Sequence, residues 1–396
     1  MSDAPPGPWL RLCALGAAAA TGAAVASGTI GIGHRELAAL ALPPLVAVAV
    51  AAWQSHPPLR APAFAALILF LAATATWWWS PLHVALAALA FGAAVLALVR
   101  STHATDGHLG GSARDYVTLT KPRIMSLLLL TGAAGMFVGY GGAPPALDVA
   151  VLLLGLGLAC GGASALNHVL DRDIDRLMGK RTERRPVASG RIPAARALEF
   201  GLVLSAASFV ILASFANVLT AHLALAGNLF YVLVYTRWLK RSTPQNIVIG
   251  GAAGAIPPLV GWAAATGELT LPALVLFAVV FLWTPPHFWA LALLIRPGYE
   301  AAGVPMLPVV RGERETTRQI VLYTLVLVGA TLLPLAWSMF GFVYAVAAVA
   351  LGAGFLWLAV ALRRDTTPRR AALLFHYSLA YLALLFVAMA VDPVLL

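Results

Sequence analysis

The chain has 396 residues, of which 61% are hydrophobic and 11% are charged, and its formal net charge is +10. In soluble domains about a quarter of the residues are charged. This composition therefore excludes a soluble globular protein and indicates a polytopic membrane protein. The basic excess does not indicate nucleic-acid binding, because the Lys and Arg residues lie in short loops between apolar segments. Cys13 and Cys160 both lie inside apolar segments and predict neither a disulfide framework nor a metal-binding pair.

Four apolar segments occupy the N-terminal part of the chain. A transmembrane helix needs about 20 mainly apolar residues, and segments near residues 9–30, 36–53, 62–79 and 83–99 meet this requirement. The first segment also has the outline of a signal peptide. We interpret it as a membrane helix because further apolar segments follow almost at once. Residues 1–110 are therefore predicted to form a four-helix transmembrane block.

Nine more apolar segments follow a polar interval. They lie near residues 124–140, 147–168, 195–215, 219–236, 246–265, 271–294, 320–339, 342–362 and 373–391. The predicted fold class is all-α, with a nine-helix bundle over residues 115–396 behind the four-helix block.

The basic residues predict the orientation of these helices, because Lys and Arg are retained on the cytoplasmic side of short loops. In the second block they occur in alternate connections, at residues 169–194, 236–242, 296–318 and 363–370, and are missing from the connections between these. We therefore predict a multi-pass protein of the cell inner membrane, embedded in the lipid bilayer, with the charged loops and the N-terminus in the cytoplasm.

The connection after the second of these nine segments carries more charge than topology requires. The positive-inside rule explains basic residues but not aspartates. Asn167, Asp171 and Asp175 are four residues apart, so on a helix they share one face. Stacked carboxylates repel each other unless a cation bridges them, and oxygen ligands are those that Mg²⁺ prefers. We predict a magnesium site on these three residues, whereas Asp173 points to another face and is predicted to be structural.

Four basic residues follow directly: Lys180, Arg181, Arg184 and Arg185. Such side chains suit a diphosphate, which carries several negative charges. The alternative is a solvated basic loop facing anionic lipid.

The stretch NHVLDRDID at residues 167–175 resembles the NxxxDxxxD motif of membrane prenyltransferases of the UbiA superfamily. Other stretches are similar to the protohaem IX farnesyltransferase (haem O synthase) branch of that superfamily. They read YVTLTKPRIMSLLLLTGAAGM, YTRWLKRSTPQNIVIGGAAGAIPPLVGW, LFAVVFLWTPPHFWALAL and YEAAGVPMLPVVRG. The resemblance covers residues 115–396 and includes these motifs in the order expected for the family.

This resemblance implies the transfer of a farnesyl group from farnesyl diphosphate to the vinyl group of protohaem IX (haem B). Water is added, and haem O and diphosphate are formed. The diphosphate is expected at the cytoplasmic mouth of the bundle, with the isoprenoid tail in the apolar interior. The residues implied to be catalytic are Asn167, Asp171, Asp175, Tyr235 and Lys240, and those implied to bind the diphosphate are Lys121, Arg123, Arg185, Arg237 and Arg241.

One departure from the wider superfamily favours haem as the acceptor. Quinone-pathway members are expected to carry a second aspartate-rich motif after the fourth core helix, where this chain has Tyr235, Arg237, Lys240 and Arg241. A prenyltransferase acting on a quinone precursor such as 4-hydroxybenzoate remains an alternative. A membrane transporter is a third hypothesis, although its polar residues are expected near the bilayer midplane in two related repeats.

Histidines give candidate haem ligands. Pro285–Pro286 is predicted to interrupt its helix, and a broken helix at membrane depth usually lines a cavity. His287, with Trp283, is expected to face the porphyrin or, alternatively, to form a hydrogen bond at the break. The N-terminal block resembles half of a haem A synthase, so we expect His34 and His83 to bind haem unless they are merely interfacial. Haem A synthase itself is a candidate partner.

Overall fold

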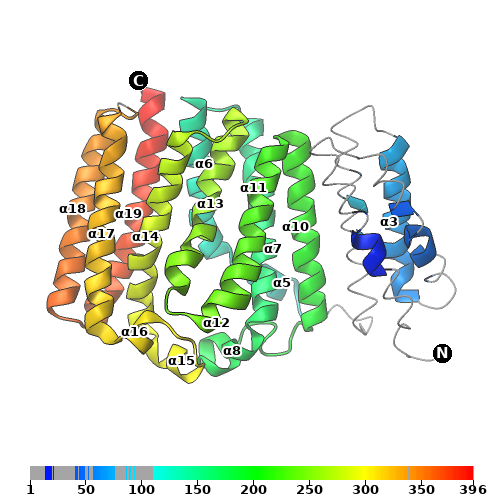
Figure 1. Cartoon of the computed structure of the whole chain (residues 1–396), viewed down its shortest axis with the longest axis horizontal. Helices are drawn as coiled ribbons and strands as arrows, with labels where there is room; N and C mark the ends of the chain where they lie inside the picture. Colours follow the sequence, from blue (N-terminus) through cyan, green and yellow to red (C-terminus); the bar gives the residue numbers. More distant parts are fainter. Residues whose placement is uncertain are drawn as a thin grey trace.

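The computed structural model describes residues 110–337 and 339–395. In the N-terminal part it describes residues 14–19, 21, 41–42, 44–49, 52, 57–75, 86, 89–90 and 93–94. Over these residues the chain forms helices and turns and contains no strand (Figure 1). The predicted all-α fold class is therefore confirmed.

Nine helices in the described part of the chain are long and apolar enough to cross a membrane. They are α6 (Pro122–Tyr140), α7 (Ala146–Leu170), α10 (Ala194–Phe215), α11 (Val218–Leu229) with its continuation, α13 (Asn246–Thr266), α14 (Leu271–Leu294), α17 (Gly312–Ala336), α18 (Phe342–Arg364) and α19 (Pro368–Leu395). The continuation of α11 is a π-helical stretch, η1 (Phe230–Leu239), followed by α12 (Lys240–Ser242). These helices match the nine predicted segments, and the prediction of a multi-pass membrane protein is confirmed.

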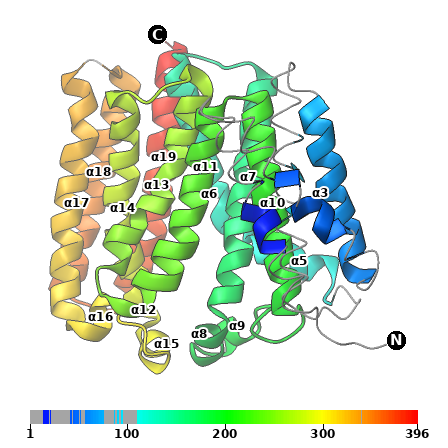
Figure 2. The ribbon, with the colours of Figure 1, turned by 45° about the vertical axis from the view of Figure 1, so that its right-hand side comes forward.

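Short helices lie in the connections at one end of the bundle. They are α5 (Ala113–Thr120), α8 (Arg172–Leu177), α9 (Lys180–Glu183), α15 (Arg296–Ala301) and α16 (Leu307–Val310). Figures 1 and 2 both show α8, α12, α15 and α16 at the end opposite to the C-terminus. We call this end the loop end, and the connections predicted to be cytoplasmic all lie there.

The predicted break at Pro285–Pro286 is wrong, because α14 runs without interruption from Leu271 to Leu294. A proline pair removes hydrogen bonds from a helix, but neighbouring helices in a membrane protein compensate for this loss. Here the indole of Trp283 donates to the Ser378 carbonyl at 2.7 Å, and the ring of His287 bonds to the Ser378 hydroxyl at 2.7 Å. These two contacts hold the helix against α19 on both sides of the prolines.

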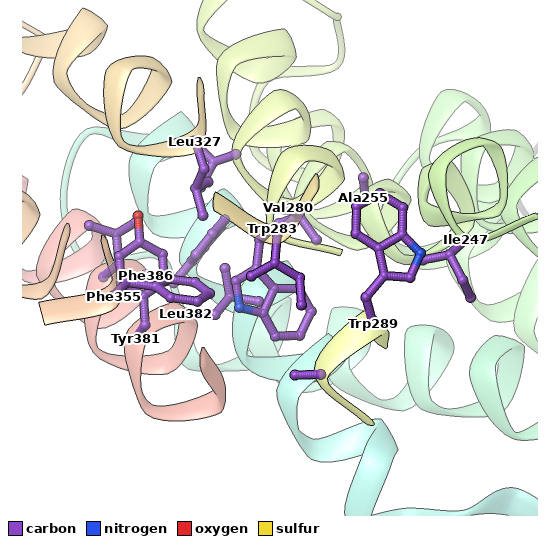
Figure 3. Packing of buried hydrophobic residues seen from close by; sticks show 14 of the residues in the cluster. Ile247, Ala255, Val280, Trp283, Trp289, Leu327, Phe355, Tyr381, Leu382 and Phe386 are labelled. Atoms are coloured by element: carbon purple, nitrogen blue, oxygen red, sulfur yellow. The ribbon is translucent and has the colours of Figure 1, made fainter. Parts of the chain in front are cut away.

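Close packing gives the bundle its core. Figure 3 shows Trp283 and Trp289 of α14 among buried side chains, and Trp289, Phe355 and Tyr381 are among the largest side chains without solvent contact. Between α6 and α13 a Cβ atom on Gly261 would overlap the carbonyl oxygen of Gly132. Small residues at such positions let membrane helices approach backbone to backbone.

The described N-terminal residues contain α3 (Pro57–Ala75) and a separate apolar cluster. The members of the cluster are mostly alanines from residues 14–18, 41–52, 63–70 and 90–94. The division into a four-helix block and a nine-helix domain stays a prediction. His34 and His83 lie outside the described residues.

Candidate active site

The junction of α7 and α8 holds the three predicted metal ligands on one face. The backbone N–H of Asp171 donates to the carbonyl of Asn167, and that of Asp175 donates to the carbonyl of Asp171, both at 2.8 Å. The helical register therefore continues through the break at residue 171. The Asn167 amide donates to Asp171 Oδ2 at 2.8 Å. All three side chains are buried, with exposed fractions of 3%, 1% and 0%; we call them the carboxylate site.

Three cationic side chains reach this site from three other segments. Lys121 donates to Asn167 Oδ1 at 2.8 Å, Lys240 to Asp171 Oδ2 at 2.5 Å, and Arg185 to Asp175 Oδ1 at 2.6 Å. The three predicted cations thus surround the two carboxylates.

Lys121 occupies an unusual backbone position between α5 and α6. Its φ of 52° lies in the left-handed region, and it ends one helix while preceding the first turn of the next. Such conformations cost about 1–3 kcal/mol and occur often at functional sites. Burial, followed by the nearby Arg185 guanidinium, lowers the pKa of the Lys121 ammonium to about 7.

Two carboxylate oxygens in this site have no hydrogen-bond partner. They are Asp171 Oδ1 and Asp175 Oδ2, and both are buried. Burial raises the pKa of Asp175, while Arg185 opposes this shift. A buried oxygen without a partner is costly, whereas a hard cation would use it as a ligand. No group of three His, Cys, Asp or Glu residues forms a metal site among the described residues, so a magnesium ion here would need the Asn167 amide and oxygens of a substrate or water.

The π-helical stretch η1 brings further side chains to the site. Thr236 accepts a hydrogen bond from the Asn167 amide at 3.1 Å. The rings of Tyr231 and Tyr235 stack with their centroids 5.5 Å apart. Tyr235 also packs so closely on α13 that a Cβ atom on Gly250 would overlap its ring. π-helical turns often occur at functional sites, but no sequence signal identified this one, and Thr236 was missed with it.

Tyr299 on α15 is a second residue that the sequence did not single out. The adjoining Gly298 lies against the end of α8, where a Cβ atom would come within 2.6 Å of the Met178 carbonyl oxygen. Burial raises the pKa of Tyr299 to about 12, Arg185 lowers it, and Asp171 and Asp175 raise it. Tyr299 therefore experiences the field of the carboxylate site. Its position at the start of the YEAAGVPMLPVVRG stretch was the only available signal.

Three predicted diphosphate ligands, Arg123, Arg237 and Arg241, form no bond with the carboxylate site among the described residues. Arg123 and Arg237 are exposed, and neither is joined to the carboxylate site by a hydrogen bond or ion pair within the described part. Arg241 instead forms two 2.7 Å bonds with Asp173 and a third with the Leu170 carbonyl. The hydrogen bond from Arg241 lowers the pKa of Asp173. Asp173 thus joins α8 to α12, and its structural role stays a prediction.

Lys180 and Arg184 form no hydrogen bond or ion pair with the carboxylates in the described part of the chain. Lys180 and Arg184 are exposed, and the side chain of Arg181 falls outside the described residues.

His287 and Trp283 form a buried cluster between α14 and α19. The imidazole is stacked between the rings of Trp283 and Phe375, at centroid distances of 4.3 and 4.7 Å. The hydroxyl of Ser378 donates its proton to the Phe375 carbonyl at 2.7 Å, so it accepts from His287 Nδ1. This assigns the proton to Nδ1 and leaves Nε2 with a free lone pair.

Comparison with known proteins gives one family and many relatives. Residues 128–386 match the model of the UbiA prenyltransferase family. A protein of Roseiflexus sp. (strain RS-1), named protoheme IX farnesyltransferase, is 48% identical over 84% of this chain and 64% of its own length. A protein of Symbiobacterium thermophilum with the same name is 54% identical over 72% of this chain and 95% of its own length.

This chain does not match every relative over that relative's full length. A protoheme IX farnesyltransferase of Roseiflexus castenholzii is 55% identical over 70% of this chain but only 52% of its own length. The chain thus spans about half to two thirds of the two Roseiflexus relatives.

Two solved structures have the same fold. A structure from work on digeranylgeranylglyceryl phosphate synthase aligns with a TM-score of 0.60 and 19% identity, over 72% of this chain and 99% of that one. The apo structure of a UbiA homolog from Aeropyrum pernix K1 aligns with a TM-score of 0.56 and 19% identity, over 68% and 98%. At this identity the two structures establish the arrangement of the helices.

Proposed function

We infer the reaction from one premise: the chain belongs to the UbiA prenyltransferase family. We propose that it transfers the farnesyl group of farnesyl diphosphate to the vinyl group of haem B and adds water, giving haem O and diphosphate. Relatives that are 48–55% identical carry the corresponding name, which supports this substrate pair.

The observation that carries the proposal is the carboxylate site itself. Two buried carboxylates each keep one oxygen without a partner, and three cations stand beside them. Burying ionisable groups at the end of a membrane bundle is expensive, and such groups are functional by default. This arrangement suits a ligand that brings both a divalent cation and several negative charges.

Asn167, Asp171 and Asp175 would hold Mg²⁺, and the donor set fits this ion because all three side chains offer oxygen atoms. The bound ion would supply positive charge that stabilises the leaving diphosphate. A bound diphosphate favours the protonated form of Lys121. With Lys121 protonated, Lys121, Lys240 and Arg185 exceed the two carboxylates by one positive charge, so that a divalent ion brings the surplus to three. An ionised diphosphate ester carries about three negative charges, and the match favours its binding.

The side chains of the site would then have separate roles in the reaction. The C1–O bond of farnesyl diphosphate breaks, and its electron pair leaves with the diphosphate, which Lys121, Lys240 and Arg185 would hold. The terminal vinyl carbon of haem attacks the allylic cation. Water adds to the carbocation left on the side chain and loses a proton. The stacked rings of Tyr231 and Tyr235 are suited to stabilise the allylic cation, because aromatic faces attract cations.

Other acceptors and functions have less support. The segments that reach the site from η1 and α15 contribute Tyr235, Lys240 and Tyr299, and none of these is a carboxylate. This supports the haem acceptor over a quinone precursor such as 4-hydroxybenzoate. A transporter is disfavoured because the carboxylate site lies at the junction of α7 and α8, and α8 is at the loop end (Figure 1), whereas the polar residues of a transporter are expected near the bilayer midplane.

Two haem-related proposals remain. We propose that His287 coordinates haem iron through the free lone pair of Nε2, with Trp283 beside it. His287 also joins α14 to α19. We also propose that the N-terminal block binds haem through His34 and His83 and that haem A synthase is a partner. The basic connections at the loop end support a cytoplasmic position for this end and for the N-terminus, in the cell inner membrane.

One assay tests the proposed reaction. The purified full chain is given haem B, farnesyl diphosphate and Mg²⁺, and the porphyrins are separated by chromatography. A parallel reaction contains 4-hydroxybenzoate in place of haem. We expect haem O only in the first reaction, and its loss in Asp171→Ala. Prenylated hydroxybenzoate without haem O, or undiminished haem O from the variant, would contradict the proposal.

A further inference from the structure

A hollow lies at the loop end, along the segment that follows the carboxylate site. Its volume is about 610 Å³, and its lining residues are Arg176, Lys180, Glu183, Arg184, Ala188 and Ser189. We call it the basic hollow. A space of this size falls in the range of small-molecule sites.

The three cations of the basic hollow have no carboxylate partner. No ion pair involves Arg176, Lys180 or Arg184 in the part of the chain that the structure describes, although other arginines of the loop end, such as Arg185 and Arg241, are paired. Arg176 Nε donates to the Ala188 carbonyl at 2.9 Å, which fixes the guanidinium at the edge of the hollow. With Glu183 counted, the lining carries two net positive charges. Like charges gathered around one space favour an anionic occupant.

The basic hollow and the carboxylate site are formed by neighbouring residues of one loop. Asp175 is buried in the site, whereas the next residue, Arg176, is exposed and lines the hollow. In the same way Arg185 reaches Asp175, whereas Arg184 lines the hollow. Arg176, Lys180 and Arg184 are therefore placed to hold a second anionic group near the diphosphate and separate from it.

We propose that the basic hollow binds the two propionate carboxylates of the haem acceptor. The identity of this ligand rests on the function proposed above. Two carboxylates match the net charge of the lining, and arginine binds a carboxylate through paired hydrogen bonds. Charged propionates are costly to bury in a bilayer, so an aqueous site at the loop end suits them. They lie on the porphyrin edge opposite the vinyl groups, so anchoring them directs a vinyl group away from the hollow.

A binding titration tests this inference without depending on product formation. The full chain is placed in nanodiscs of neutral lipid and titrated with haem B or with haem dimethyl ester, and the Soret absorbance is followed. The variant is Arg176→Gln/Arg184→Gln. The matched control is Arg172→Gln, which changes an exposed arginine on the same helix outside the hollow. Repeating the titration in nanodiscs with anionic lipid shows whether a lipid headgroup is the occupant.

We expect the double variant to bind haem B about tenfold more weakly than the wild type, a loss of about 1.4 kcal/mol. The dimethyl ester should bind the variant and the wild type equally, and Arg172→Gln should match the wild type. Equal affinities of variant and wild type for haem B would overturn the inference, and so would an equal loss for the ester. Competition by anionic lipid that the double variant abolishes, with haem affinity unchanged, would assign the hollow to lipid instead.

These outcomes stay separate from the test of the reaction. Propionate-dependent haem binding without any haem O formation would contradict the proposed reaction. It would still support the basic hollow as the propionate site. Haem O formation together with unchanged haem binding in the double variant would overturn the proposed role of the basic hollow and leave the proposed reaction intact.

Discussion

Replacing Asp171 by Asn separates the electrostatic role of this carboxylate from its shape. Asp171 is 1% exposed, and Lys240, which is 8% exposed, donates to it at 2.5 Å. The amide keeps the volume of the side chain but removes the charge that compensates the buried ammonium. Breaking a buried ion pair by removing one partner costs about 3–5 kcal/mol. We expect Asp171→Asn to lower both the thermal stability and the rate of prenyl transfer.

A double variant distinguishes these two effects. In Asp171→Asn/Lys240→Met both charges are gone, and replacing a whole buried pair by uncharged groups is often close to neutral for stability. Stability should therefore return. Activity should stay low by about 10²–10³-fold in kcat, because removing one preorganised electrostatic group costs about this much and here two are missing.

The assay combines thermal unfolding, followed by tryptophan fluorescence in detergent, with haem O formation on the same samples. A conservative Lys240→Arg variant controls for loss of the positive charge. Two results would refute the reasoning. The first is an unfolding temperature for Asp171→Asn equal to that of the wild type, and the second is restored activity in the double variant.

Three further predictions use other parts of the fold. Gly250→Ala should displace the ring of Tyr235, cost about 1–3 kcal/mol of stability and slow prenyl transfer, whereas Gly254→Ala on the same helix meets open space and should be silent in both measurements. Asp392→Ala removes the acceptor of two backbone N–H groups at the start of α18; thermal unfolding should show a loss of about 1–2 kcal/mol, while an altered KM for farnesyl diphosphate would argue against a purely structural role. In a His34→Ala/His83→Ala background, His287→Phe should abolish the imidazole signature in the spectrum of the haem-bound protein, and an unchanged spectrum would exclude this residue as an iron ligand.

The spans could be predicted from the sequence because length and hydropathy decide them. The predicted segment at 320–339 corresponds to a helix that begins at Gly312, since a polar first turn with Glu313 and Glu315 extends beyond the apolar part. Acidic residues at a helix N-terminus are favourable, but hydropathy does not detect them. The continuity of α14 through Pro285–Pro286 depends on its neighbours and could not be predicted from local sequence.

The carboxylate site was predictable where its residues are close together in the sequence or lie in stretches that resemble the family. The spacing of Asn167, Asp171 and Asp175 is local, so the sequence displays it. The partners Thr236 and Tyr299 come from distant segments, one of them through a π-helical stretch, and no periodicity marks them. The arginines show the same limit, because Arg185 and Arg241 have similar sequence surroundings but different partners.

Part of the first 110 residues has a counterpart in at least one relative. Residues 111–396 make up less than three quarters of the chain, whereas the match to the Roseiflexus sp. (strain RS-1) protein covers 84% of it. The match must therefore extend into the first 110 residues. The likeness of this block to half of a haem A synthase stays a prediction, because its histidines lie outside the described residues.

The ion pairs of the carboxylate site predict that magnesium and diphosphate bind together. In this structure Lys240 and Arg185 already neutralise the two aspartates that are predicted to hold the ion. Magnesium alone would bind the two oxygens without a partner, Asp171 Oδ1 and Asp175 Oδ2, beside cations that already neutralise these carboxylates and repel the ion. Diphosphate offsets this repulsion, since its negative charges interact with the ion and with the cations together. We expect the affinity for Mg²⁺, measured by calorimetry on the full chain, to rise at least about tenfold when inorganic diphosphate is present, a coupling free energy of about 1.4 kcal/mol. Diphosphate also binds Mg²⁺ free in solution. The heat of that reaction is measured with the Asp171→Asn/Asp175→Asn variant as the control and is subtracted. Equal magnesium affinities with and without diphosphate would mean that the buried cations do not oppose binding of the ion.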